Sequence, residues 1–490
     1  MNGFNKQRVF TIFLPGILFA LTFSTLFTPI AHIGDGPAYL KYAMQVAGHD
    51  VPENFIHRSP LYSHLIATVI NRVEKDVLYR ILVSIQFVLN FFTSYLIFCI
   101  GEFLYSRKAL GVLAATLFFF NPASIYFAYV ILTESLAIFL FIVVVYSLLK
   151  FQSSLHLRWA VCLGTSTTLL FLSRFNTLPI MLVLLVIFLY ITRDLIRDRL
   201  MKFIKVLCAF ICPVIILLNM YCLYNWYRYQ EFRVLSLGGS SMISRNAIIA
   251  SLDGDEKVTP DLEPVLKVFL QSKKDYYEQL EYTREGSLLE YDKFRLMHKL
   301  GAGFGVYKLA LEDVKEYYGL DEYASESEIA KAISPFYQQI LNQNRTDILK
   351  LRLYSFLNGF RSSLGPIEKT HFVVARGDKV NLDLLPAGIR VFFKLIYLGV
   401  SLSTLVLCLI HVTSNLLKGR GGKTAFYIIV ILCYSFYATN FMFATMMDAN
   451  RFNYPSEPLM LLLFIYNINI LFRREDLSMA RNNRWDLFCS

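Results

Sequence analysis

The sequence predicts an all-α, polytopic membrane protein with about ten transmembrane helices and a large, mainly helical extracytoplasmic loop domain. Three observations support this fold class. Hydrophobic residues make up 55% of the 490 positions and charged residues only 17%. Apolar stretches long enough to cross a bilayer recur near both ends of the chain, whereas residues 225–388 are rich in Asp, Glu, Lys and Tyr. Short basic connections alternate with the apolar stretches in the way that the positive-inside rule requires.

The first apolar stretch, residues 9–30, follows Lys6 and Arg8. It is too long for the core of a signal peptide and has no small-residue cleavage pattern after it, so we expect a retained transmembrane helix. The complete set of expected crossings covers approximately residues 9–30, 79–101, 109–125, 133–149, 159–173, 175–192, 206–224, 389–411, 424–446 and 459–472.

Two apolar stretches are too long for a single crossing and must fold back. Residues 109–149 contain a single charged residue, which is Glu134. Asn121-Pro122 supplies a break within this stretch, because proline disfavours helix in the residue before it. Residues 159–192 contain Arg174 near the middle, so a hairpin would place Arg174 at its tip.

The basic residues set the orientation. The net charge is +11, but no basic run is interleaved with aromatic residues, so we expect no nucleic-acid partner. With about ten crossings, the clustered basic connections all fall on the cytoplasmic side, together with both termini. The opposite face of the plasma (inner) membrane then receives residues 31–78, 121–134, the hairpin tip at Arg174, 225–388 and 447–458.

The chain therefore divides into three parts. Residues 1–224 form an N-terminal transmembrane module of about seven helices, whose first outer loop is 31–78. Residues 225–388 form the loop domain, in which apolar residues recur at helical spacing in two segments. Residues 389–490 form a C-terminal module of about three helices.

Ionisable residues beside the outer membrane boundary are candidates for function, because charge near hydrocarbon is costly. Each has an ordinary structural alternative. Asp35 precedes Gly36-Pro37 and suits a helix N-cap, Glu134 and Arg174 suit a structural ion pair, and His57-Arg58 suits an interfacial basic pair. Arg451 suits a plain loop charge. The full set is Asp35, His57, Arg58, Glu134, Arg174, Asp448, Arg451 and Glu457.

The order of five motifs resembles the GT-C superfamily of glycosyltransferases. The motifs are "GDGPAYLKYA", "HRSPLYSHLIATV", "NP" followed by "LTESLAIFL", "FLSRFNTLPIMLV" and "NRFNYPSEPLMLLL". GT-C members are polytopic enzymes that use polyprenyl-phosphate-linked sugars, and they include protein O-mannosyltransferases and the aminoarabinose transferases of lipid A in lipopolysaccharide. The resemblance covers residues 1–190 and roughly the last 50, and the long loop takes no part in it.

The resemblance implies roles for individual positions. Asp35 matches the acidic residue of the first outer loop, which implies a general base or a carboxylate that orients the acceptor. Arg58 matches the basic residue before "PL", which implies contact with the donor phosphate. Glu134 matches the acid at the start of the fourth helix, and Arg451 resembles the basic residue before "YP". The sequence lacks a second acid beside Asp35 and a clear metal set, so no cofactor is required and a divalent metal is left open.

The chemistry of such a reaction agrees with these residue types. Displacing a sugar from phosphate builds negative charge on the leaving oxygen, which Arg58, Arg174 or Arg451 would stabilise. A base such as Asp35 would take the proton of the acceptor hydroxyl, and a single displacement would invert the anomeric configuration. We expect His57, Tyr39 and Tyr454 to bind substrate and Glu134 to act with Asp35.

The expected partners are a polyprenyl-phosphate-linked sugar, membrane lipid, and a glycan, lipid or protein acceptor at an extracytoplasmic active site. Two alternatives remain. An O-antigen polymerase or ligase would also be polytopic with a large outer loop, but would work through arginines of that loop. A non-enzymatic transporter would carry charged or broken helices in the middle of the membrane.

Overall fold

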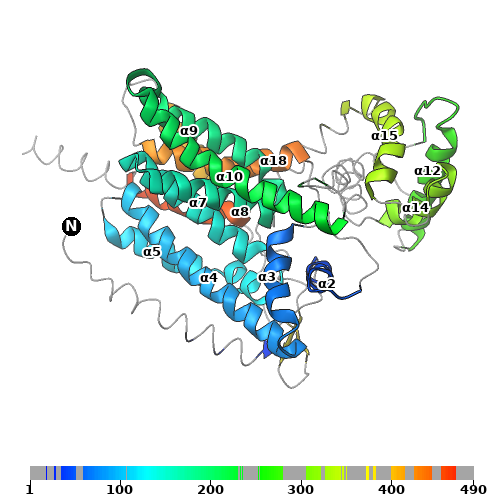
Figure 1. Ribbon diagram of the computed structural model, residues 1–490, viewed down its shortest axis with the longest axis horizontal. Helices are drawn as coiled ribbons and strands as arrows, with labels where there is room; N and C mark the ends of the chain where they lie inside the picture. The colour runs from blue at the N-terminus through cyan, green and yellow to red at the C-terminus, as the bar shows by residue number, and fades with distance from the viewer. Residues whose placement is uncertain are drawn as a thin grey trace, which may run out of the picture.

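The computed structural model describes residues 35–50, 59–105, 107–229, 254–279, 305–321, 326–343, 399–413, 424–443 and 454–470, with three short strands and a few single positions besides. The described chain is mainly helical and polytopic, so the predicted fold class is confirmed. Figure 1 shows long helices lying side by side in one bundle, with a group of shorter helices beyond one end of it.

The predicted N-terminal module supplies most of the described bundle. Its elements are α2 (Gly36–Val46), α3 (Pro60–Ile70), α4 (Lys75–Leu104), α5 (Lys108–Phe119), α6 (Pro122–Tyr129), α7 (Glu134–Ser154), α8 (Leu157–Ser173), the 3₁₀ turn η1 (Phe175–Thr177), α9 (Leu178–Asp198) and α10 (Leu200–Tyr229).

Four described helices are long and apolar enough to cross a membrane: Lys75–Leu104, Glu134–Ser154, Leu178–Asp198 and Leu200–Arg228. The α5–α6 pair passes the same test as one broken span. Three of the shorter apolar helices overlap three further predicted crossings: Leu157–Ser173, Gly399–Thr413 and Glu457–Ile470. Apart from two single helical positions and the strand at 27–28, the predicted crossing at 9–30 lies outside the described residues.

Both predicted breaks are present. The axes of α5 and α6 differ by 50° across Phe120–Pro122, and the Asn121 side chain caps α6 by accepting a hydrogen bond from the Ala123 amide at 2.9 Å. Proline at the first helical position needs no amide partner, which suits this start. Arg174 lies between the end of α8 and η1, at the tip of the predicted hairpin.

Three short strands, which the all-α prediction does not include, are also present. The strands β1 (Phe27–Thr28), β2 (His371–Val374) and β3 (Lys379–Asn381) form one antiparallel sheet in the order β1-β2-β3. Phe27 pairs with Val374 and His371 with Asn381. The end of the first predicted transmembrane segment is therefore a strand, because its backbone pairs with residues more than 300 positions later, which local periodicity does not reveal.

The predicted loop domain contains α12 (Glu263–Gln279), α14 (Gly305–Tyr317) and α15 (Glu326–Gln343). Their shared core includes Phe269 and Phe336, whose rings stack at 5.4 Å between centroids. The mainly helical character expected for this segment is thus seen in its described parts. In Figure 1 these helices lie together, apart from the long helices of the bundle.

The bundle is packed around α7, the most buried of the long helices. Rings of Phe151, Phe188 and Phe210 stack from α7 through α9 to α10, at 5.1 Å and 4.6 Å between centroids. Gly164 of α8 allows α8 and α10 to approach closely, because a Cβ at that position would lie 2.1 Å from the Phe210 carbonyl oxygen.

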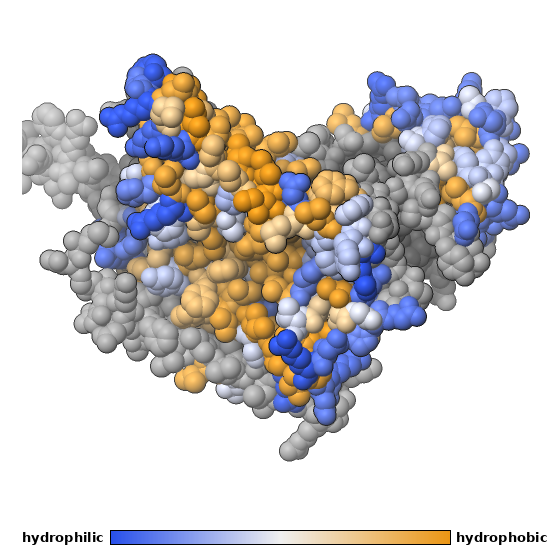
Figure 2. Space-filling view, in the orientation of Figure 1, coloured by the Kyte–Doolittle hydropathy of each residue, from blue (hydrophilic) through white to orange (hydrophobic). Residues whose placement is uncertain are grey.

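The outer surface of the bundle is apolar. Large exposed side chains on α9 and α10 include Leu182, Val186, Ile215 and Ile216. Figure 2 shows a continuous hydrophobic surface over the middle of the bundle and polar residues at the end of α9 and on the α12–α15 group. An apolar patch of this kind fits contact with lipid.

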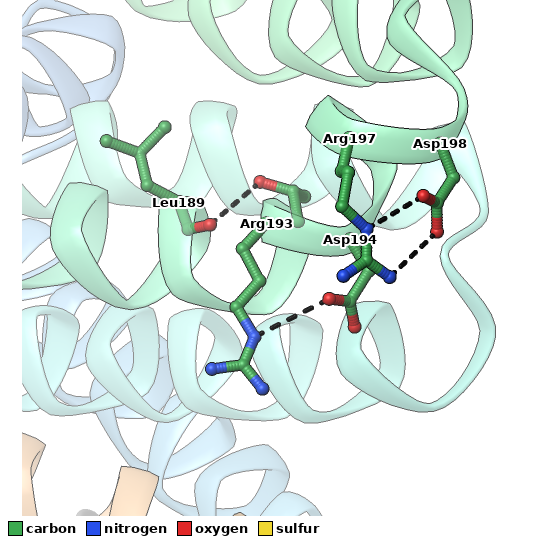
Figure 3. Close-up of polar contacts among 6 residues, drawn as sticks. Leu189, Arg193, Asp194, Arg197 and Asp198 are labelled. Carbon is green, nitrogen blue, oxygen red and sulfur yellow. Dashed lines mark hydrogen bonds and ion pairs between the residues drawn. The ribbon is translucent and has the colours of Figure 1, made fainter.

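The polar end of α9 carries two exposed ion pairs between adjacent residues (Figure 3). Arg193 Nε lies 3.7 Å from Asp194 Oδ1, and Arg197 Nε lies 2.9 Å from Asp198 Oδ1. These residues belong to the basic connection for which the sequence predicts a cytoplasmic position.

Candidate active site

An ion pair between Glu134 and Arg174 lies inside the bundle. Glu134 is the first residue of α7, where the helix dipole favours an acidic side chain, and Arg174 follows α8. Glu134 Oε1 and Arg174 Nη1 are 3.7 Å apart, and the two side chains are 0% and 5% exposed. The two members come from the two breaks that the sequence predicted, so folding back brings them together.

The backbone around Arg174 is held firmly. Its amide donates to the carbonyls of Leu170 and Phe171, and its carbonyl accepts from the amide and the hydroxyl of Thr177 at 3.0 Å and 2.7 Å. These bonds join the last turn of α8 to η1, so the guanidinium extends from a fixed point.

The segment around Glu134 is polar although it is buried. Thr133 and Ser135, on either side of Glu134, are 1% and 0% exposed. Among the described residues neither hydroxyl has a hydrogen-bond partner. Buried hydroxyls normally find a partner, so this region is suited to a polar ligand or to water.

Tyr62 connects this pair with helix α3. Its hydroxyl donates to Gln86 Oε1 at 3.0 Å. Burial, and next the nearby Glu134 carboxylate, raise the pKa of the Tyr62 hydroxyl. Tyr62 is therefore a neutral hydrogen-bond donor at physiological pH, close enough to Glu134 to interact with it electrostatically.

Asp35 is connected with Tyr62 through helix α2. Asp35 occupies the N-cap position of α2, but its side chain makes no capping hydrogen bond, and its carbonyl accepts from the Tyr39 amide. The Tyr39 ring meets the Tyr62 ring edge to face at 5.8 Å, and the Ser63 hydroxyl donates to the Tyr39 carbonyl. Asp35 thus lies one helical turn from Tyr39, whose ring contacts the ring of Tyr62.

The C-terminal module reaches the same part of the bundle. Asn121 Nδ2 donates to Glu457 Oε2 at 3.4 Å, and Glu457 is 5% exposed. Tyr454 belongs to the 3₁₀ turn η3 (Tyr454–Ser456) directly before Glu457. The Asn121 break and the predicted last outer loop therefore meet.

Three predicted site residues, His57, Arg58 and Arg451, lie outside the described residues, as does Asp448. Of the proposed phosphate-binding cations, Arg174 is the one that the described ranges contain. Within these ranges no group of three or more His, Cys, Asp or Glu side chains suits a metal ion.

Gln86 of α4 joins this polar region, and Asn90 lies one turn further along the same helix; neither was predicted. Gln86 and Asn90 are buried, and both donate to main-chain carbonyls around α6. The available signal was a pair of amide side chains at i, i+4 spacing in an apolar segment, on one helix face.

No protein-family model and no curated protein matches this chain. Its structure is similar to two crystal structures of ArnT from Cupriavidus metallidurans, a member of the GT-C family, one bound to undecaprenyl phosphate and one in the apo state. The former has a TM-score of 0.35 and 12% identity, covering 92% of this chain and 78% of that chain. The latter has a TM-score of 0.33 and 12% identity, covering 91% and 77%. Because these scores are low, the functional argument depends on the residues of the site.

Proposed function

We propose that this protein is a membrane glycosyltransferase that moves a sugar from a polyprenyl-phosphate donor to a glycan, lipid or protein acceptor at the extracytoplasmic face. The observation that carries the proposal is the buried Glu134–Arg174 pair. Asp35, Glu134 and Arg174 are also the residues that the sequence motifs indicate.

In the proposed reaction the acceptor oxygen attacks the anomeric carbon while the bond from that carbon to the phosphate oxygen breaks. Polyprenyl phosphate leaves with the bonding electrons, and Asp35 takes the acceptor proton. Arg58, Arg174 and Arg451 stabilise the leaving phosphate. One displacement inverts the anomeric configuration.

The burial of Glu134 gives it a more specific role within this scheme. The carboxylate lies beside the Arg174 guanidinium, which carries several N–H donors in a planar fork that suits carboxylate and phosphate alike. We therefore assign Glu134 to orienting Arg174 toward the donor phosphate. His57, Tyr39 and Tyr454 would contact substrate, and the loop domain 225–388 would recognise the acceptor.

The purified full-length chain in detergent, incubated with a panel of polyprenyl-phosphate sugars and candidate acceptors, tests the proposal. We expect release of polyprenyl phosphate with at least one donor, and an NMR assignment of the product that shows inversion. Retention would overturn the single displacement, and no release from any donor would overturn the donor class.

Asp35→Asn tests the base. We expect a loss of turnover of about 100-fold or more, because general-base catalysis contributes about 10²–10⁴-fold. Asp50→Asn is the matched control, since Asp50 is exposed just beyond the other end of α2. Equal activity of the two variants would contradict the role of Asp35 and favour an O-antigen polymerase or ligase working through arginines of the loop.

A transporter is the second candidate function. The 50° break between α5 and α6, together with charged side chains buried in the bundle, is the observation that favours it. Reconstituted vesicles distinguish the two: substrate flux without release of polyprenyl phosphate supports transport and contradicts transfer.

A further inference from the structure

Gln86 ties three segments of the bundle together. Its Nε2 donates to the carbonyls of Ala128 and Val130, both at 3.0 Å, and its Oε1 accepts from the Tyr62 hydroxyl at 3.0 Å. The side chain is 1% exposed, so all three bonds are made away from water. One amide thereby joins α3, α4 and the connection between α6 and α7.

The connection that Gln86 holds is irregular and fully inside the protein. The four residues between α6 and α7, 130–133, are at most 3% exposed. The carbonyls at the end of a helix lack partners in their own helix, and unpaired main-chain groups inside a membrane protein are costly. One amide hydrogen of Gln86 supplies a partner to the Ala128 carbonyl in the last turn of α6. The other gives a second donor to the Val130 carbonyl, which also accepts from the Leu132 amide at 2.9 Å.

The residue that follows this connection is Glu134, whose carboxylate must meet Arg174 across the bundle. We infer that Gln86 is a positioning residue: it fixes the α6–α7 connection, and through it places Glu134 against Arg174. This inference rests on the proposed transferase function for its kinetic consequence, but the placement of Glu134 is testable without activity.

Asn90 provides a matched control on the same face of the same helix. Its Nδ2 donates to the Ser124 carbonyl at 2.8 Å, near the start of α6 and away from the connection that leads to Glu134. Asn90→Leu removes a buried amide of similar size and leaves the bonds to Ala128 and Val130 in place. A merely structural effect of losing a buried amide would be common to Gln86→Leu and Asn90→Leu.

The kinetic test uses the full-length protein and the donor that the panel above identifies. Gln86→Leu is expected to lower kcat by about 10- to 100-fold with little change in the donor KM, because small displacements of a reacting constellation have effects of this size. Gln86→Glu keeps the acceptor for Tyr62, and its buried carboxyl regains one donor when protonated. Its activity relative to the unchanged protein should therefore recover as the pH falls. Equal kcat values for Gln86→Leu and Asn90→Leu, or a pH-independent Gln86→Glu ratio, would overturn the inference.

A double-mutant cycle on thermal unfolding in detergent keeps the test independent of the proposed function. The effect of the double variant Gln86→Leu, Glu134→Gln on the unfolding equilibrium constant should differ from the product of the two single effects by about twofold or more. Residues that belong to one hydrogen-bond network show such non-additivity. Asn90→Leu combined with Glu134→Gln should be additive. Additivity in both cycles would overturn the inference, whether or not the protein shows transferase activity. If the unchanged protein is inactive but Gln86 and Glu134 are coupled, only the proposed function is overturned.

Discussion

The Glu134–Arg174 pair and the ion pairs at the end of α9 consist of the same chemical groups in opposite environments. Glu134 and Arg174 are 0% and 5% exposed, whereas the members of the Arg193–Asp194 and Arg197–Asp198 pairs are 55–78% exposed. Arg174 lies 3.7 Å from its partner and Arg197 only 2.9 Å from its own. Distance alone would therefore rank the exposed pair as the more important.

Burial reverses that ranking. Water screens the exposed pairs, and ordering their long side chains costs entropy, so they contribute little to stability. Removing two charges from water is expensive, and a buried pair is often no more stable than apolar residues in its place. A buried pair in a membrane protein is therefore evidence of function more than of stability. The four predictions below, in order of expected effect, test this contrast.

Removing one member of the buried pair should have the largest effect. Glu134→Gln should destabilise the protein by about 3–5 kcal/mol, because it leaves the Arg174 charge buried without its carboxylate. The measurement is thermal or denaturant unfolding in detergent. The double variant Glu134→Gln, Arg174→Met should recover much of the loss, and a double variant with the summed loss would show that the two residues act independently.

Gly164→Ala should come next, because it separates α10 from α8, the helix that ends before Arg174. The added methyl group would lie 2.1 Å from the Phe210 carbonyl oxygen, a backbone atom that cannot move aside alone. We expect destabilisation of about 1–3 kcal/mol or more. Gly399→Ala is the control, since no atom of the described residues lies within 4 Å of its added methyl group. An equally small effect at both glycines would contradict the close approach of α8 and α10.

Tyr62→Phe should cost about 1–3 kcal/mol, because it leaves the buried Oε1 of Gln86 without its donor. Unfolding in detergent measures the loss. Tyr434→Phe is the matched control: the Tyr434 hydroxyl is buried in α18 (Thr424–Phe443) and has no hydrogen-bond partner among the described residues. If both changes are neutral, the polar connection from α3 to Gln86 contributes nothing.

Arg193→Ala and Arg197→Ala should have the smallest effect, with unfolding midpoints unchanged within error. Both side chains are mostly exposed, so water replaces the lost contact. The same unfolding assay, repeated at low and high salt, checks the expectation. A loss as large as that of Tyr62→Phe would contradict the contrast between the two environments.

Most of the bundle was predictable because its signals are local. Apolar runs with basic ends located α4, α7, α9 and α10, and proline after Asn121 located the break between α5 and α6. The strand at Phe27–Thr28 was not predictable, since it depends on pairing with β2 far along the chain.

The site was predictable in part. Each of Glu134 and Arg174 is a lone charge in a long apolar stretch, and their ion pair was the structural alternative to a functional role for these two residues. Gln86 was not named, because an amide inside a helix shows its importance only when the carbonyls of Ala128 and Val130 are seen opposite it. Predictions for His57, Arg58 and Arg451 concern residues outside the described ranges.

The sequence by itself determined that the chain is a polytopic membrane protein and which charged residues border its apolar segments, because hydrocarbon imposes length and composition on every crossing. Only the tertiary structure decided which of those charges meet and which neutral groups hold them. Contacts such as Tyr62 with Gln86, or Asn121 with Glu457, join residues 24 and 336 positions apart. Their formation depends on how the helices pack, and helix packing depends on the side-chain surfaces of both helices at once, so no single segment of the chain determines it.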